Sequence, residues 1–137
     1  RTDELVLVVP TGHPLARRKS VRLTDALAFD FVGMHPGSAI NNQLTRAAAE
    51  AQLPLKLRIQ VTGYDALCLM VAAGLGVGVM PRGSAALYSG SLAVRTVTLA
   101  EPWAQRRLVL CVRSYEALSS VSRLLVDHLR TSAGASQ

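Results

Sequence analysis

The sequence predicts an α/β protein, in which short strands and longer helices alternate along one chain. Several short runs are either continuously apolar or alternate between apolar and polar residues, which is typical of buried and half-buried strands. Between them lie longer segments whose apolar residues recur every three or four positions, as on one face of a helix. This alternation indicates a sheet with parallel neighbouring strands.

The composition fits a globular domain and argues against two other classes of protein. The 137 residues, 50% of them hydrophobic, suffice for one domain or two small lobes. The longest apolar runs, residues 66–73 and 5–10, are much shorter than the roughly 18 residues that span a membrane. The net charge is +6, but the basic clusters are short and are not interleaved with aromatic residues. We therefore expect no membrane association and no nucleic-acid contact by this part of the chain.

The first part of the chain predicts two strands and two helices. Residues 5–9 form a continuous apolar run, as expected for a strand covered on both faces. Thr24 is a candidate N-cap for a short helix over residues 25–28, and residues 30–34 form the next strand. Ser38 then caps a longer helix. One face of this helix carries Ile40, Leu44, Ala47, Ala48 and Ala51.

Pro54 marks the end of that helix near Gln52. Residues 55–61 alternate between apolar and polar side chains, which predicts a strand with one covered face. Residues 64–73 form a helix that is apolar nearly all round. We expect this helix to be buried in its lobe, with part of one face in a subunit contact.

Three alternate glycines, Gly74, Gly76 and Gly78, follow this helix and lead into a short strand that ends at Pro81. Glycine adopts positive φ at little cost and lets two backbones approach closely. The pattern therefore predicts a helix that turns back tightly onto a sheet.

The last part of the chain predicts a short helix or turn at 81–88, a strand at 92–99 and a second strand at 107–113. Residues 117–130 follow as an amphipathic helix. Its apolar side carries Leu118, Val121, Leu125 and Leu129. Residues 131–137 are small and polar and predict a disordered tail. The apolar side of this helix needs a packing partner, so we expect the strand and helix to associate or to remain loosely ordered.

Several of these segments together resemble the effector-binding, or substrate-binding, domain of LysR-type transcriptional regulators. The resemblance covers residues 3–130. It rests on Val71–Pro81, Glu4–Pro10, His13–Ala16 and Phe31–Met34, the last followed by Gly37 and Ser38.

The resemblance implies a periplasmic-binding-protein type II-like fold with two lobes. We expect one complete lobe plus the closing strand and helix of the other. Residues 1–12 would be a crossing strand from the first lobe, 13–99 the second lobe, and 100–130 the return strand and closing helix, before the tail at 131–137. The chain would then be a fragment that lacks the start of the first lobe and the DNA-binding domain.

A ligand site is predicted where the carboxyl ends of three strands meet, because open α/β sheets bind ligands at that edge. The turns after these strands begin helices whose free N–H groups and hydroxyls could hold a carboxylate. The resemblance places effector contacts at the same turns. The predicted ligand-binding residues are Met34, His35, Gly37, Ser38, Thr62, Gly63, Tyr64, Met80 and Pro81. The alternative is structural, with Ser38 only a helix cap and Tyr64 only a lid over the core.

No catalytic, metal or cofactor site is predicted. The histidines His13, His35 and His128 lack the surroundings of a catalytic triad, and the three glycines follow a helix instead of opening one, unlike a dinucleotide fingerprint. Cys68 and Cys111 lie in apolar runs and are predicted to be small core residues. A peroxide-sensing thiol pair, known in the resembled family, is disfavoured because apolar neighbours raise a thiol pKa.

The resemblance implies a cytoplasmic, ligand-sensing regulatory domain of a LysR-type transcriptional regulator that is not an enzyme. We expect it to bind a small anionic metabolite in the cleft between its two lobes and thereby to control transcription. We predict this small-molecule effector to be a carboxylate, and we expect the domain to associate with further copies of itself. DNA would be bound only through an N-terminal domain. The alternative is a two-lobed solute receptor of a transport system, because such receptors share this architecture. An upstream helix-turn-helix would identify the regulator, and an upstream signal peptide would identify the receptor.

Overall fold

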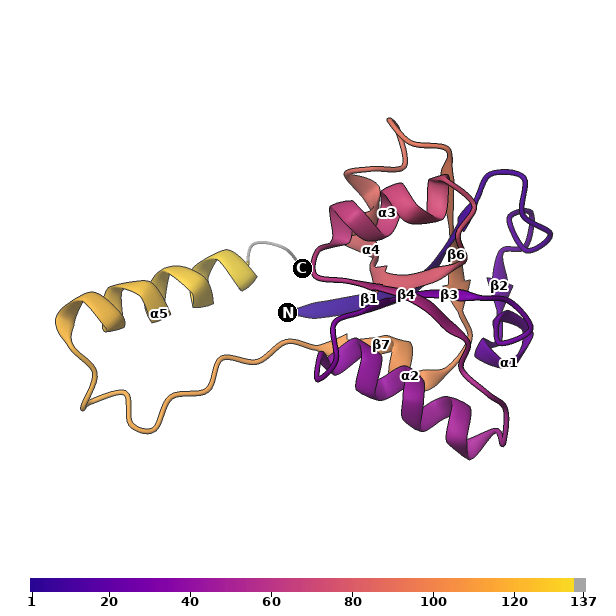
Figure 1. Ribbon diagram of the computed structural model, residues 1–137. Coiled ribbons are helices and arrows are strands. Elements are labelled where there is room, and N and C mark those ends of the chain that lie inside the picture. Colours follow the sequence, from indigo (N-terminus) through magenta and orange to yellow (C-terminus); the bar gives the residue numbers. More distant parts are fainter. Residues whose placement is uncertain (135–137) are drawn as a thin grey trace. The chain divides into compact units, whose positions relative to one another are not determined.

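A computed structural model describes residues 1–134 and divides the chain into two compact units (Figure 1). The larger unit is Glu4–Gln105, and the smaller unit combines Arg1–Asp3 with the chain from Arg106 onward. The elements are β1 (Thr2–Pro10), β2 (Ser20–Val21), α1 (Leu23–Ala26), β3 (Phe31–Met34), α2 (Ala39–Glu50), β4 (Leu57–Val61), α3 (Tyr64–Ala72), β5 (Gly78–Pro81), α4 (Arg82–Ala86), β6 (Val94–Leu99), the 3-10 helix η1 (Pro102–Ala104), β7 (Gln105–Arg107) and α5 (Ser120–Gly134). None of the described helices is both long enough and apolar enough to cross a membrane.

The strands form a sheet in the order β2-β6-β1-β5, with β7 also paired to β1, and a two-stranded sheet of β3 and β4. A parallel bridge between Phe31 and Val77 connects β3 to the chain entering β5. The α/β class is thus confirmed. Parallel pairing holds for β2 with β6 and β3 with β4, but β1 is antiparallel to both β5 and β6. The residues of β5 and β6 that pair with β1 follow 70 to 92 positions later in the chain, so no local pattern could reveal their direction.

β1 forms the centre of the core, and both of its faces are covered as predicted. Leu5, Leu7 and Val9 pack in the cluster that contains Ile40, Leu44 and Ala48 of α2. Val6 and Val8 point to the other side, in the cluster that contains Leu67, Cys68 and Val71 of α3. Figure 1 shows α2 and α3 on opposite sides of these strands.

Of the two N-caps predicted from the sequence, the structure confirms one and contradicts the other. Ser38 is the N-cap of α2, and its Oγ accepts a hydrogen bond from the Asn41 N–H at 3.1 Å, as predicted. Thr24 was wrongly predicted to cap α1, because that helix already begins at Leu23 with Arg22 as its N-cap. The Asp25 carboxylate accepts from the Arg22 N–H at 3.3 Å, so an acidic residue in the first turn stabilises this start.

The prediction of a tight return after α3 is confirmed. Gly74 has φ 81° and Gly76 has φ 156°. A Cβ on Gly76 would lie 2.6 Å from the Asp30 carbonyl oxygen. That oxygen accepts a hydrogen bond from the Val77 N–H at 2.9 Å, so only glycine lets the two backbones meet here.

The apolar face of β4 is more exposed than predicted, whereas α3 is buried except for part of its surface. The strand β4 was expected to have one covered face, but Leu57 and Ile59 are both 36% exposed. Alternation distinguishes the two faces of a strand, but it does not supply an element to cover one of them. On α3, Leu69 is exposed while Leu67, Cys68 and Val71 are buried.

The smaller unit departs most from the sequence prediction. Of the predicted strand 107–113, only Arg107 belongs to a strand, at the end of β7, and residues 108–113 form none. The helix begins at Ser120 instead of residue 117 and continues to Gly134, so residues 131–134 of the predicted tail are helical. Residues 135–137 lie outside the described residues. Cys111 was predicted to be a core residue but is exposed, because segment 108–112 is itself uncovered.

We expect Gly76→Ala to lower the free energy of unfolding by about 2–4 kcal/mol, because the new methyl meets a backbone carbonyl and alanine disfavours this φ. Urea denaturation of the variant measures this effect. Gly83→Ala is the matched control, since nothing lies within 4 Å of its added Cβ. Equal stability of the two variants would contradict the close approach at Gly76.

The uncovered apolar side chains of the smaller unit predict self-association. On α5, Val121, Leu124, Leu125 and Leu129 are exposed, and Leu108, Val109, Leu110 and Val112 are exposed in the preceding segment. Apolar surface of this extent is seldom left in contact with water. We expect Leu125→Glu to reduce the associated fraction in sedimentation velocity, whereas Leu87→Glu, at an exposed leucine of the larger unit, should not. A chain that is monomeric at all concentrations would refute this expectation.

The two cysteines are expected to differ in reactivity. Burial raises the pKa of the Cys68 thiol, and the negative charge of Asp65 raises it further, so the reactive thiolate is scarce. Cys111 is exposed. A thiol reagent should therefore modify Cys111 rapidly in the native chain and Cys68 only after unfolding. Cys111→Ser should abolish the rapid phase, and its survival in that variant would show that Cys68 is accessible.

Candidate functional site

The carboxyl ends of β3, β4 and β5 meet at one edge of the larger unit, which we call the carboxyl edge. Met34, the last residue of β3, pairs with Val61, the last residue of β4. On the other side of β3, the parallel bridge between Phe31 and Val77 brings Met34 level with Met80 of β5. The turns that follow β3 and β4 therefore lie side by side.

The turn after β3 carries His35, Gly37 and Ser38. His35 is exposed, and its Nδ1 lies 3.1 Å from the Pro36 carbonyl oxygen. Gly37 has φ 85°, which turns the chain into α2. Ser38 uses its Oγ as an acceptor for the helix cap, so its own hydroxyl hydrogen is available to a ligand. The first turn of α2 contains no acidic residue, which leaves the positive end of this twelve-residue helix uncompensated.

The turn after β4 carries Thr62, Gly63 and Tyr64. Thr62 is exposed, Gly63 is the N-cap of α3, and Tyr64 is partly buried against both core clusters. The Asp65 carboxylate lies over this turn, with Oδ1 2.5 Å from the position that a Cβ on Gly63 would take. A carboxylate here offsets the positive end of α3. Of the two helix starts at this edge, that of α2 is therefore the better anion site.

The third strand end contributes less than expected to the exposed surface. Met80 is fully buried, and the Cys68 Sγ lies 3.4 Å from its Sδ. Met34 is also buried, whereas Pro81 is half-buried and serves as the N-cap of α4. Met34 and Met80 thus form the apolar floor beneath the turns.

Arg82 was not singled out from the sequence, yet it lies immediately after β5. Its Nε and Nη2 donate to the two Glu4 carboxylate oxygens at 2.5 and 3.1 Å, and Nη2 also donates to Thr98 Oγ1 at 2.8 Å. The bond to Glu4 raises the pKa of Arg82. Antiparallel pairing of Leu5 with Pro81 creates this contact, and that pairing has no local sequence signal.

Two further polar side chains lie beside Met34 and were also missed. Gln60 Nε2 donates to the Met34 carbonyl oxygen at 3.2 Å. Asn41 is 8% exposed, and its Oδ1 is buried without a hydrogen-bond partner among the described residues. That oxygen lies 3.1 Å from the position that a Cβ on Gly33 would take. A polar residue on the buried face of α2 was the available signal for Asn41.

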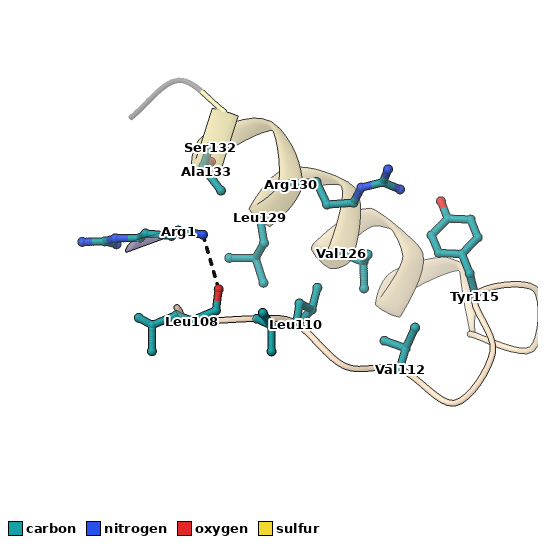
Figure 2. A pocket seen from close by; sticks show the side chains of 11 residues that line it. Arg1, Leu108, Leu110, Val112, Tyr115, Val126, Leu129, Arg130, Ser132 and Ala133 are labelled. Carbon is teal, nitrogen blue, oxygen red and sulfur yellow. Dashed lines mark hydrogen bonds between the residues drawn. The ribbon is translucent and has the colours of Figure 1, made fainter. Parts of the chain in front are cut away.

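None of the nine predicted ligand-binding residues lines either of two hollows on the described surface. The larger, about 730 Å³, lies within the smaller unit between α5 and segment 108–112 (Figure 2). Its wall includes Leu108, whose carbonyl oxygen accepts a hydrogen bond from the Arg1 amino group at 3.3 Å. The second, about 200 Å³, lies in the larger unit at the opposite ends of the strands. No cluster of potential metal ligands occurs among the described residues.

Known proteins match this fold and sequence over much of the chain. Among curated proteins, the chain is 28% identical to the transcriptional activator protein LysR of Escherichia coli over 99 residues, which cover 72% of this chain and 32% of that protein. It is 29% identical to the transcriptional dual regulator GltC of Bacillus subtilis over 80 residues, which cover 58% of this chain and 27% of GltC. The chain thus spans about a third or less of these relatives.

Solved structures also match the fold of this chain. The effector-binding domain of QuiR in complex with shikimate is 26% identical, with a TM-score of 0.67 over 77% of this chain and 49% of the chain in that structure. The regulatory domain of Synechocystis CcmR in complex with 2-PG has a TM-score of 0.77 at 18% identity, over 93% of this chain and 62% of that one. The family model described as the LysR substrate binding domain matches residues 1–134. The chain therefore belongs to the LysR substrate binding domain family, the ligand-sensing part of LysR-type transcriptional regulators.

Proposed function

We propose that this domain serves a cytoplasmic transcriptional regulator and binds a small carboxylate at the carboxyl edge without transforming it. The observation that carries the proposal is the register of β3 and β4, which brings the Ser38 cap of α2 beside the turn at Thr62 and Gly63. These groups donate hydrogen bonds to an anion but include no positioned nucleophile or base. The site therefore suits recognition.

The carboxylate is proposed to bind at the start of α2. This helix end offers unpaired N–H groups, the Ser38 hydroxyl and an uncompensated dipole. His35 and Thr62 flank it and could contact the rest of the effector. The ligands of QuiR and CcmR, shikimate and 2-phosphoglycolate, both carry a carboxylate group, which supports this chemistry.

The domain division remains part of the proposal. We propose that residues 1–12 cross from a first lobe, 13–99 form the second lobe, and 100–130 return to the first. DNA would be bound by a separate N-terminal domain, and copies of the protein would associate. The curated relatives LysR and GltC are regulators, which favours this function over a transport receptor. An effector would act by binding one arrangement of lobes or protomers more tightly than another.

We expect Thr62→Ala to weaken binding of shikimate or 2-phosphoglycolate about fivefold to tenfold, the loss of one hydrogen bond to the effector. Amide chemical shifts measured during titration give the affinity and locate the bound anion. Thr45→Ala is a matched control, because Thr45 is an exposed threonine on α2 that bonds to the Asn41 carbonyl oxygen instead.

Ser38→Gly removes the second hydroxyl at little cost to the cap, since glycine is tolerated at N-caps. It should also weaken both anions. Unchanged affinity in Thr62→Ala and Ser38→Gly, or shifts confined to other regions, would refute the carboxyl edge as the site.

A further inference from the structure

The hollow of about 200 Å³ lies at the amino ends of the same strands, and we call it the amino-edge hollow. His13 lines it from the turn after β1, Phe29 and Asp30 from the chain entering β3, Arg58 from β4, and Leu75 and Gly76 from the loop between α3 and β5. All of these residues belong to the larger unit. Four separate segments thus converge on one small concavity.

The hollow contains one positive and one negative side chain that do not form a hydrogen bond with each other. Arg58 Nη1 and Asp30 Oδ2 are 4.0 Å apart, and the two side chains are 54% and 50% exposed. This distance is too long for a hydrogen bond, and an exposed pair of this kind contributes little to stability. The guanidinium therefore retains donors, and the carboxylate retains acceptor positions, for a bound molecule.

One wall of the hollow is formed by two rings. The ring centroids of His13 and Phe29 are 4.4 Å apart at an interplanar angle of 67°, an edge-to-face contact. The Leu15 N–H donates to His13 Nδ1 at 3.1 Å, so the neutral ring carries its proton on Nε2. Burial lowers the pKa of His13, which favours this neutral form. The wall thus combines apolar surface with one hydrogen-bond donor, His13 Nε2, and adds no charge to the hollow.

We propose that the amino-edge hollow binds a small α-amino acid as a zwitterion, with the ligand carboxylate on Arg58 and the ammonium group on Asp30. The charges of the hollow sum to zero, so a ligand with both charges fits better than a simple anion or cation. Its volume lies below the roughly 300 Å³ at which pockets for drug-sized molecules begin, which limits the ligand side chain to a few atoms against the ring wall. This site is separate from the carboxyl edge and does not depend on the function proposed for it.

Amide chemical shifts of the 137-residue chain, titrated with L-alanine, test the proposal. We expect saturable shifts at residues 13, 30, 58 and 74–77. Acetate and ethylamine, which each carry half of the zwitterion, should bind at least about tenfold more weakly, because each loses one charged hydrogen-bonded contact. No saturable shift at these residues with L-alanine, or acetate shifts at these residues that saturate at the same concentration, would overturn the proposal.

Variants at Arg58 and Asp30 test the two proposed contacts, with the ligand carboxylate and with the ligand ammonium group. Arg58→Gln and Asp30→Asn should each weaken L-alanine binding at least about tenfold. Arg46→Gln removes an exposed charge on α2, and Thr45→Ala alters an exposed hydroxyl on the same helix, so both should leave L-alanine affinity unchanged. Equal loss in Arg46→Gln would show a nonspecific charge effect and refute the site. The comparison of ligands on the unmodified chain remains decisive even if one variant is poorly folded.

Discussion

The burial of β1 on both faces is the constraint on which the larger unit depends. Leu5 to Val9 are each at most 1% exposed, and alternate residues belong to the two core clusters on either side. Each fully buried aliphatic side chain contributes roughly 1.5–3 kcal/mol, so this one strand supplies a large share of the hydrophobic stabilisation. A shift of one residue along its partners would exchange the two faces, and the register is therefore strongly fixed. The pairing of Leu5 with Pro81 in turn fixes where β5 ends.

The carboxyl edge follows from this register by a short series of pairings. Pairing with β1 fixes the position of β5. The bridge between Phe31 and Val77 then fixes the position of β3 against the chain entering β5. Pairing of Met34 with Val61 fixes the position of β4 against β3. Gly76 is essential to the second step, because any Cβ there would collide with the Asp30 carbonyl oxygen. The glycines that attract attention in the sequence therefore act on the ligand edge indirectly. They allow the strands to align so that the turns at Ser38 and Thr62 become neighbours.

Local signals predicted the parts of this arrangement that depend on adjacent residues. The Ser38 cap, the buried face of α2 and the positive φ of Gly74 and Gly76 each follow from a few neighbouring side chains. The features that the sequence did not predict depend on pairing between distant parts of the chain. The antiparallel direction of β1, the burial of Met80 and the contact between Arg82 and Glu4 arise from residues far apart in sequence. The exposure of Cys111 and of Ile59 depends on whether another element covers them, and amphipathic pattern alone cannot report that.

The two edges of β3 differ in electrostatic character, which bears on how they could act together. The carboxyl edge presents the uncompensated start of α2, whereas the amino edge presents the balanced charges of Arg58 and Asp30. β3 and β4 connect them over only a few residues, or roughly 10–13 Å along a strand. The two strands are paired from Val32 to Met34, and their register shifts between Phe31 and Val32, so a short paired segment connects the two edges. If both edges bind ligands, linkage requires each ligand to change the affinity of the other by the same factor. A ligand that tightens β4 against β3 would thereby also fix the spacing of the Ser38 and Thr62 turns, on which recognition of a carboxylate depends.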